Sequence, residues 1–117
     1  MPYDARKCLE EIQYRAAGIR SLQAGRTFAE FQSDIAFCWA VERAFEVIGE
    51  AIGRLRKVDP ALAEQIPDSR SIVSFRNLLI HGYDSVDQAV VWRLIHHDLP
   101  ILSEAVDRLV AGLPFPT

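Results

Sequence analysis

The segment from Arg76 to Tyr83 concentrates polar side chains that suit chemistry on a phosphate. It reads Arg-Asn-Leu-Leu-Ile-His-Gly-Tyr, so a guanidinium, a carboxamide, an imidazole and a phenol lie close together in the chain. Histidine titrates near neutral pH and can move a proton to or from a ribose 2′-hydroxyl or a leaving oxygen. Arginine offers a planar fork that binds phosphate and stabilises developing charge. These residue types fit phosphodiester chemistry, although an arginine and a histidine near a helix end are also common as caps and surface charges.

Helix geometry limits how these side chains converge. At about 100° per residue, Arg76 and His81 point about 140° apart from one straight helix. Asn77 and His81 are four residues apart and share a face. Gly82 is a natural helix terminator. Convergence of Arg76 and His81 on one phosphate therefore requires a helix break near Gly82 or a second copy of the chain.

Amphipathic helices on both sides must position this segment. Long helices are predicted over residues 3–24, 34–57 and 85–112, because apolar residues recur there at alternating spacings of three and four. The first stripe is Leu9, Ile12, Ala16, Ile19 and Leu22. The central helix carries one stripe of Cys38, Val41, Phe45, Ile48, Ile52 and Leu55, and a second of Ala40, Ala44, Val47 and Ala51. One helix that buries two faces is typical of a bundle core or a dimer interface.

Capping and breaking residues mark the ends of these helices. Gly25 closes the first helix, and Thr27 with Glu30 forms a capping box for a short helical turn. Ser33 or Asp34 caps the central helix, and Asp59-Pro60 opens a short helix through about residue 65. A helix opened by Ser69 or Ser71 carries the 76–83 segment. Ser85 to Gln88 is a second capping-box pattern, and Pro100 should kink or divide the last helix.

Length and composition predict one globular domain over residues 1–117, with 114–117 as a frayed tail. Half of the 117 residues are hydrophobic and a quarter are charged. Short loops between long helices favour an all-α, antiparallel up-down bundle of four to five helices. The net charge of −3 argues against broad non-specific coating of nucleic acid, but it permits a local basic cleft.

Several other residues fit structural roles. Cys8 and Cys38 are interpreted as buried thiols, and Trp39 and Trp92 as core or interface anchors rather than base-stacking platforms. His96-His97-Asp98 is interpreted as a solvated face, so no metal site or cofactor is expected. Glu42, Glu46 and Glu50 fit a solvated or salt-bridged face, although Glu50 could also face a cleft. Arg54, Arg56 and Lys57 fit a solvated helix end, although they could instead add phosphate contacts. No signal peptide or membrane-spanning run is found, so a soluble cytoplasmic protein is expected.

The 76–83 segment resembles the Arg-x4-His-x-Tyr motif of HepT-like proteins, also known as the DUF86 family, within the HEPN superfamily. Two further stretches resemble that family: Phe45 to Ala51, with its Ile-Gly-Glu-Ala core, and Val90 to Pro100, with Val-Val-Trp and Asp-Leu-Pro. The resemblance implies a HEPN-like helical fold that dimerises with the motif at the dimer cleft. It also implies a toxin of a two-gene toxin–antitoxin system that acts as a metal-independent RNase.

Residue by residue, the resemblance assigns catalysis to Arg76 and His81 and a supporting role to Asn77. It makes Tyr83 the site at which an antitoxin, a minimal nucleotidyltransferase, attaches an adenylyl group. The expected partners are a second copy of the chain, that nucleotidyltransferase and an RNA substrate. The alternative is a non-catalytic module that docks a nucleotidyltransferase and binds nucleotide or RNA without cutting it.

Overall fold

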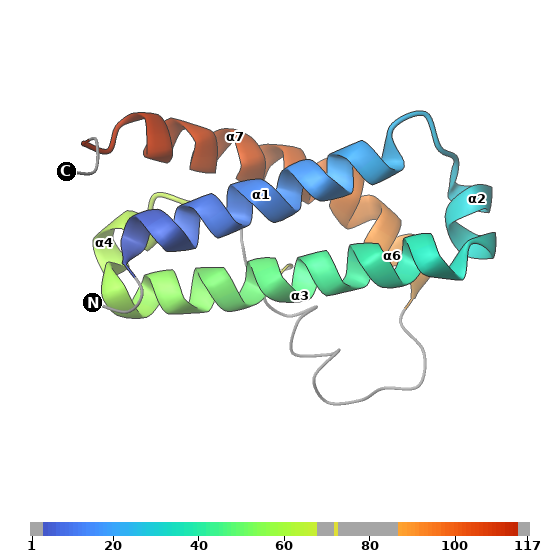
Figure 1. Cartoon of the computed structure of the whole chain (residues 1–117), viewed down its shortest axis with the longest axis horizontal. Helices are drawn as coiled ribbons and strands as arrows, with labels where there is room; N and C mark the ends of the chain where they lie inside the picture. Colours follow the sequence, from blue (N-terminus) through green and yellow to red (C-terminus); the bar gives the residue numbers. More distant parts are fainter. Residues whose placement is uncertain (1–3, 68–71, 73–86, 115–117) are drawn as a thin grey trace.

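Two long antiparallel helices form the spine of the molecule (Figure 1). In the computed structural model, the described residues are 4–67, 72 and 87–114. Helix α1 spans Ala5–Gln23, and the Asp4 side chain caps it by accepting a hydrogen bond from the Lys7 backbone N–H at 2.9 Å. The predicted stripe of α1 is buried at its first four positions, whereas Leu22 is 41% exposed. The α1 stripe therefore faces the core until its last turn.

A tight connection leads from α1 to the short helix α2, Phe28–Ser33. Gly25 adopts a φ of 72°, a left-handed conformation that glycine accepts without the strain a Cβ brings. The predicted capping box is present: Thr27 Oγ1 accepts from the Glu30 N–H at 3.1 Å, and Glu30 Oε1 accepts from the Thr27 N–H at 3.1 Å. The chain therefore turns sharply and restarts as a helix at the predicted residues.

Helix α3, Ile35–Val58, buries most of two faces, as its double stripe predicts. Asp34 caps it, and all six residues of the first stripe are buried. In the second stripe Ala44, Val47 and Ala51 are buried, while Ala40 is exposed. Helix α4, Pro60–Ala63, follows with Asp59 as its cap, and it ends two residues earlier than predicted.

The C-terminal part is divided in three, which confirms the break predicted at Pro100. Helix α6 spans Gln88–Arg93, the wide π-helical turn η1 spans Leu94–Asp98, and α7 spans Leu99–Ala111. A π-helical turn is one of the identifiable causes of a helix bend, and the path changes direction at this point in Figure 1. The prediction that Ser85 caps this helix is wrong, because Asp87 is the extended cap residue and accepts from the Ala89 N–H at 2.9 Å.

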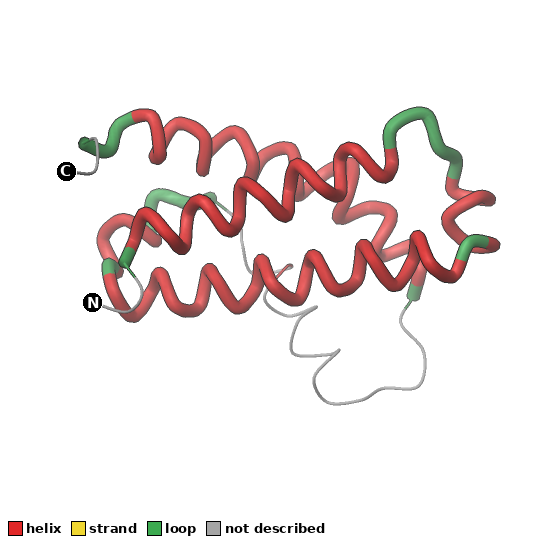
Figure 2. Tube along the Cα trace, in the orientation of Figure 1, coloured by secondary structure: helices red, strands yellow, loops and turns green. Residues whose placement is uncertain are grey.

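These helices enclose one apolar core and confirm the all-α antiparallel bundle (Figure 2). Helix α7 runs back along α1, and α2 contacts both α3 and α6. The described residues contain no strand. Ile72 is helical and fully buried, whereas the rest of the helix predicted to begin at Ser69 or Ser71 and to carry the 76–83 segment lies outside the described residues. The predicted dimer stays a prediction, since the structure contains a single chain.

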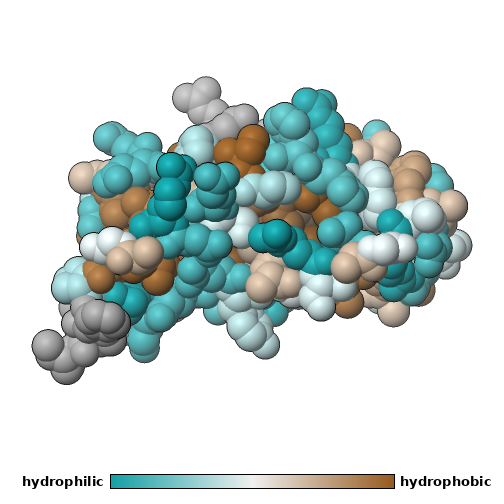
Figure 3. Space-filling view, turned by 90° about the horizontal axis from the view of Figure 1, so that it is seen from above, coloured by the Kyte–Doolittle hydropathy of each residue, from teal (hydrophilic) through white to brown (hydrophobic). Residues whose placement is uncertain are grey.

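Polar side chains cover most of the face seen from above, with apolar patches between them (Figure 3). Among the described residues, no helix is both long enough and apolar enough to cross a membrane.

Candidate functional site

All four predicted site residues, Arg76, Asn77, His81 and Tyr83, lie outside the described residues. The structure describes residues on both sides of this segment in the chain. Ile72 is buried in the core before the segment, and Asp87 begins α6 after it. Just after this segment in the chain, a polar side chain at the start of α6 meets polar side chains of α3.

A thiol-centred hydrogen-bond network joins the first residue of α6 to α3. Gln88 Nε2 donates to Cys38 Sγ at 3.6 Å, and Cys38 Sγ donates to Glu42 Oε2 at 3.2 Å. Burial raises the pKa of the Cys38 thiol, which keeps it protonated and able to donate. The predicted burial of Cys38 and Cys8 is confirmed. The network itself was not predicted, because Gln88 lies 50 positions away in the chain.

A cleft of about 560 Å³ opens beside this network, and we refer to it as the Trp39 cleft. Its lining residues come from α2, α3 and the start of α6: Gln32, Ser33, Ile35, Cys38, Trp39, Glu42 and Gln88. Trp39 is 64% exposed and Ile35 is 62% exposed. The volume lies within the range of small-molecule sites, about 300–1,000 Å³.

The two tryptophans have different environments. Trp92 packs in an aromatic cluster, with ring centroids 5.8 Å from Phe28, 5.3 Å from Phe31 and 4.5 Å from His96. Its predicted anchoring role is thereby confirmed. For Trp39 the core alternative is wrong, because α3 presents it outward, away from the buried stripes. The interface alternative stays a prediction.

The charged residues of α3 follow the predicted solvated or salt-bridged pattern. Glu42, Glu46 and Glu50 are half-buried, and Glu46 Oε1 pairs with Arg43 Nη1 at 2.7 Å. The basic residues of the last turns, Arg54, Arg56 and Lys57, are exposed. Exposed cations in the last turn suit the negative end of the helix dipole.

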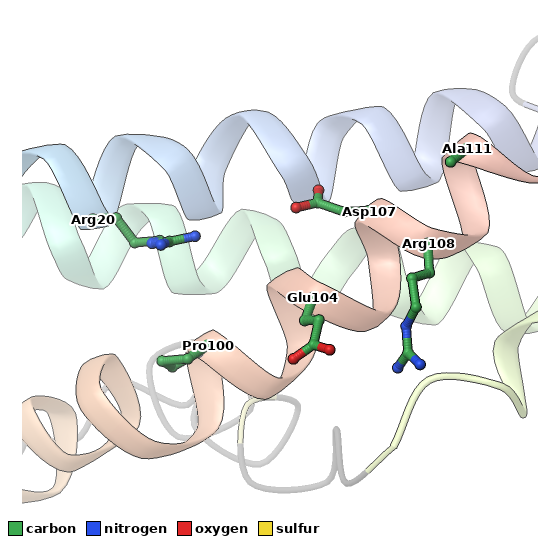
Figure 4. A pocket seen from close by; sticks show the side chains of 6 residues that line it. All are labelled: Arg20, Pro100, Glu104, Asp107, Arg108 and Ala111. Atoms are coloured by element: carbon green, nitrogen blue, oxygen red, sulfur yellow. The ribbon is translucent and has the colours of Figure 1, made fainter.

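A second hollow, of about 530 Å³, lies between α1 and α7 (Figure 4). Arg20 reaches into it from α1, while Glu104, Asp107 and Arg108 come from α7, with Asp107 turned toward α1 (Figure 4). Two polar contacts link these helices: Gln13 Nε2 donates to Asp107 Oδ1 at 2.8 Å, and Arg20 Nη1 to Ser103 Oγ at 3.5 Å. Among the described residues that line this hollow, the two cations and the two carboxylates balance in charge.

A third hollow, of about 480 Å³, is mostly apolar and lies between α1 and α3. Small side chains form much of its floor, and Tyr14, which is 72% exposed, stands at its edge. Among its described lining residues Arg15 is the charged one, and the others offer mainly apolar contact.

The His96-His97-Asp98 cluster lies on η1. His96 and His97 are exposed, as predicted, whereas the Asp98 side chain is only 9% exposed. His96 lies within hydrogen-bonding distance of the Trp92 carbonyl (2.9 Å) and of Gln23 Oε1 (3.1 Å), and His97 Nδ1 lies 3.1 Å from Asp98 Oδ1. Within the part of the chain that the structure describes, no group of three or more His, Cys, Asp or Glu residues could hold a metal ion.

Comparison with known proteins places these features in a family. Residues 12–109 match the family described as ribonuclease HepT-like. The chain belongs to the HepT-like family. The matched range runs from within α1 into α7, and it includes the 76–83 segment on which the resemblance was based.

Curated relatives of this HepT-like chain carry ribonuclease names. It is 33% identical over 101 residues to the probable ribonuclease HepT of Thermococcus cleftensis. The aligned region covers 86% of this chain and 91% of that protein. It is 28% identical over 106 residues to the proposed RNase MJ1380 of Methanocaldococcus jannaschii, covering 89% and 94% of the two chains. The proposed RNase TTE0752 of Caldanaerobacter subterraneus is 29% identical over 105 residues, covering 90% and 93%. No solved structure is significantly similar to the chain.

Proposed function

We propose that this HepT-like chain is the toxin of a toxin–antitoxin pair and an endoribonuclease that uses Arg76 and His81. One observation carries the proposal: the family match covers residues 12–109, and within that range the Arg-x4-His-x-Tyr motif is complete. The ribonuclease names of its relatives support the choice of RNA as substrate.

The proposed reaction is attack of a ribose 2′-oxygen on the adjacent phosphorus. His81 takes the proton of the 2′-hydroxyl, the new P–O2′ bond forms, and the P–O5′ bond breaks. The leaving 5′-oxygen receives a proton, so the products are a 2′,3′-cyclic phosphate and a 5′-hydroxyl. The guanidinium of Arg76 stabilises the extra negative charge of the transition state, and Asn77 orients the imidazole or the phosphate. Each step uses only side chains and RNA, so the reaction requires no metal ion.

A homodimer completes this site. Arg76 and His81 diverge by about 140° on one straight helix, and a second protomer supplies the same groups from another direction. Two imidazoles at one cleft also allow one to accept the proton while the other donates to the leaving oxygen.

A nucleotidyltransferase antitoxin would switch this site off at Tyr83. Transfer of an adenylyl group from a nucleoside triphosphate to the phenolic oxygen releases pyrophosphate and leaves a phosphodiester on the tyrosine. The added negative charge and bulk, two residues from His81, repel and block an RNA phosphate. Mass spectrometry after co-expression with the antitoxin should detect one added adenylyl unit on Tyr83; an unmodified tyrosine in a neutralised complex contradicts this step.

The experiment that tests the proposal is RNA cleavage by the purified protein in the presence of a metal chelator. We expect cleavage that leaves cyclic phosphate ends, and a loss of about a hundredfold or more in His81→Ala and Arg76→Ala. The matched control is His97→Ala, which removes an exposed histidine from η1 and should cleave normally. Equal cleavage by His81→Ala and the unaltered protein would rule out the mechanism. Tight RNA binding without cleavage by any form favours the non-catalytic binding module instead.

A further inference from the structure

We propose that the Trp39 cleft binds one unpaired base of the RNA, stacked on the Trp39 indole. The inference rests on the proposed function, since it names the part of the substrate that this cleft recognises. It adds a binding residue to α3, far in sequence from the Arg76–Tyr83 motif.

The apolar side of the cleft has the form of a stacking platform. Ile35 and Trp39 are one helical turn apart on α3, and both are more than half exposed. A large aromatic side chain left open to water beside a concave surface can be covered by a flat, apolar partner. A nucleobase has two such faces, and proteins that bind single-stranded RNA stack bases on aromatic side chains in this way.

The polar side of the cleft suits the edge of a base. Gln32, Ser33 and Gln88 bring neutral groups that both donate and accept hydrogen bonds. A carboxamide has two N–H hydrogens and one carbonyl oxygen, and the bond to Cys38 uses only one N–H of Gln88. That bond also fixes the orientation of the amide at the rim of the cleft, so its remaining groups are presented in one direction.

The charge of the lining favours a base over a phosphate. Among the described residues that line the cleft, Glu42 is the charged one, and none is a lysine or an arginine. A carboxylate repels a phosphate, but it accepts hydrogen bonds from the amino groups of cytosine or adenine. The base therefore enters the cleft while the RNA backbone stays outside.

The cleft is close to the proposed catalytic motif along the chain. Gln88 follows Tyr83 by five residues, and an extended chain of this length spans at most about 18 Å. A short single strand can therefore reach both. Double-stranded RNA keeps its bases stacked inside the helix, so the cleft selects single-stranded or looped RNA.

Binding of short RNA to the full-length chain tests this inference. The probe is a fluorescein-labelled single-stranded hexanucleotide, and His81→Ala serves as the parent protein so that the probe stays intact. Fluorescence anisotropy should show a Kd about tenfold higher when Trp39→Ala is added, because a lost base–aromatic stack costs about this factor or more. Trp39→Phe should restore most of the affinity. Tyr14→Ala is the matched control, since it removes another exposed aromatic side chain outside this cleft.

A second set of probes assigns the loss to a base. One abasic site is moved along the hexanucleotide, so that each probe keeps every phosphate but lacks one base. At one position the missing base should weaken binding to the parent about tenfold and leave binding to the Trp39→Ala form unchanged. Equal losses in both proteins at every position overturn the inference, and so does a Trp39→Ala form that binds as tightly as the parent.

The remaining outcomes separate this inference from the proposed function. If Trp39→Ala binds RNA normally but changes the oligomeric mass by light scattering, the cleft is a protein interface and the inference is wrong. Failure of every probe to bind also overturns it. If binding depends on Trp39 but the His81-containing protein cleaves no RNA, the base site stands and the nuclease proposal falls.

Discussion

Asp34 has two partners at the start of α3. Its Oδ1 accepts from the Phe37 backbone N–H at 3.1 Å, which caps the helix, and its Oδ2 pairs with Arg26 Nη2 at 2.8 Å. The Arg26 guanidinium also lies over the Phe37 ring, 4.2 Å from its centroid. A single carboxylate therefore joins the turn before α2 to the helix that carries the Trp39 cleft.

The ionisation of Asp34 should make stability depend on acid pH. The hydrogen bond from Arg26, followed by that from the Phe37 N–H, holds the pKa of this carboxyl below its usual 3.8. A carboxyl whose pKa is lowered by folding stabilises the folded state above its unfolded pKa, and this contribution is lost as the pH falls through the folded value. The contribution of Asp34 is therefore present in full at neutral pH and disappears below pH 3.8.

The variant that measures this contribution is Asp34→Asn, because asparagine still caps a helix but cannot form the ion pair. We expect its thermal midpoint to lie below that of the unaltered chain at neutral pH. This difference between the two thermal midpoints should narrow as the pH is lowered past 3.8. Arg26→Gln should show the same narrowing. A difference in thermal midpoint that stays constant with pH would mean that the charge of Asp34 contributes nothing to stability.

At the scale of elements, α2 lies at one end of the bundle and packs against both α3 and α6 (Figure 1). Phe31 is fully buried, and its ring lies 5.1 Å from that of Phe37 on α3 and 5.3 Å from that of Trp92 on α6. A helix of six residues has little stability of its own, so its capping box contributes a large share.

Thr27→Ala removes this cap and should destabilise the chain by about 1 kcal/mol. The free energy of unfolding in urea, measured by circular dichroism, tests this value. Thr27→Ser keeps a hydroxyl at the same position and should lower the free energy of unfolding much less. Equal destabilisation by both substitutions would show that the methyl group, and not the hydrogen bond, is what matters.

Most element boundaries follow from local chemistry and could be predicted. The stripes of α1 and α3 and the caps at Thr27 and Asp59 need only neighbours within a few residues. The start of α6 was misplaced because Ser85 and Asp87 are both good caps, and the sequence does not decide which takes the extended conformation. Pro100 indicated a break, yet it does not specify that the wide turn η1 accommodates it.

The site was harder to predict than the fold. The motif 76–83 was found from residue types and family resemblance, and its geometry lies outside the described residues. The exposure of Trp39 was not predicted, because apolar residues occur on several faces of α3 and periodicity does not tell which faces other helices cover. The contact of Gln88 with Cys38 depends on tertiary packing, for which local sequence carries no signal.

At the scale of the whole molecule, the proposed cleavage of RNA by an acidic chain requires its cations to be concentrated at the site. The net charge is −3, and the described residues that line the Trp39 cleft add a carboxylate rather than a cation. Strong attraction of RNA through many phosphates is therefore not available to a single chain. Pairing two copies of Arg76 at one cleft doubles the local positive charge where the phosphate is cut, which gives the proposed dimer an electrostatic reason as well as a geometric one.

A mixing experiment decides whether the active site needs both protomers. The double variant Arg76→Ala/His81→Ala is added in increasing excess to a fixed amount of the unaltered chain, under conditions in which subunits exchange and RNA is saturating. If each site draws catalytic groups from both protomers, every mixed dimer is inactive, and activity per unaltered chain should fall toward zero. If each protomer holds its own site, that activity should stay constant at any excess. The same excess of His97→Ala, which keeps Arg76 and His81, should cause no loss, because its mixed dimers still contain complete sites.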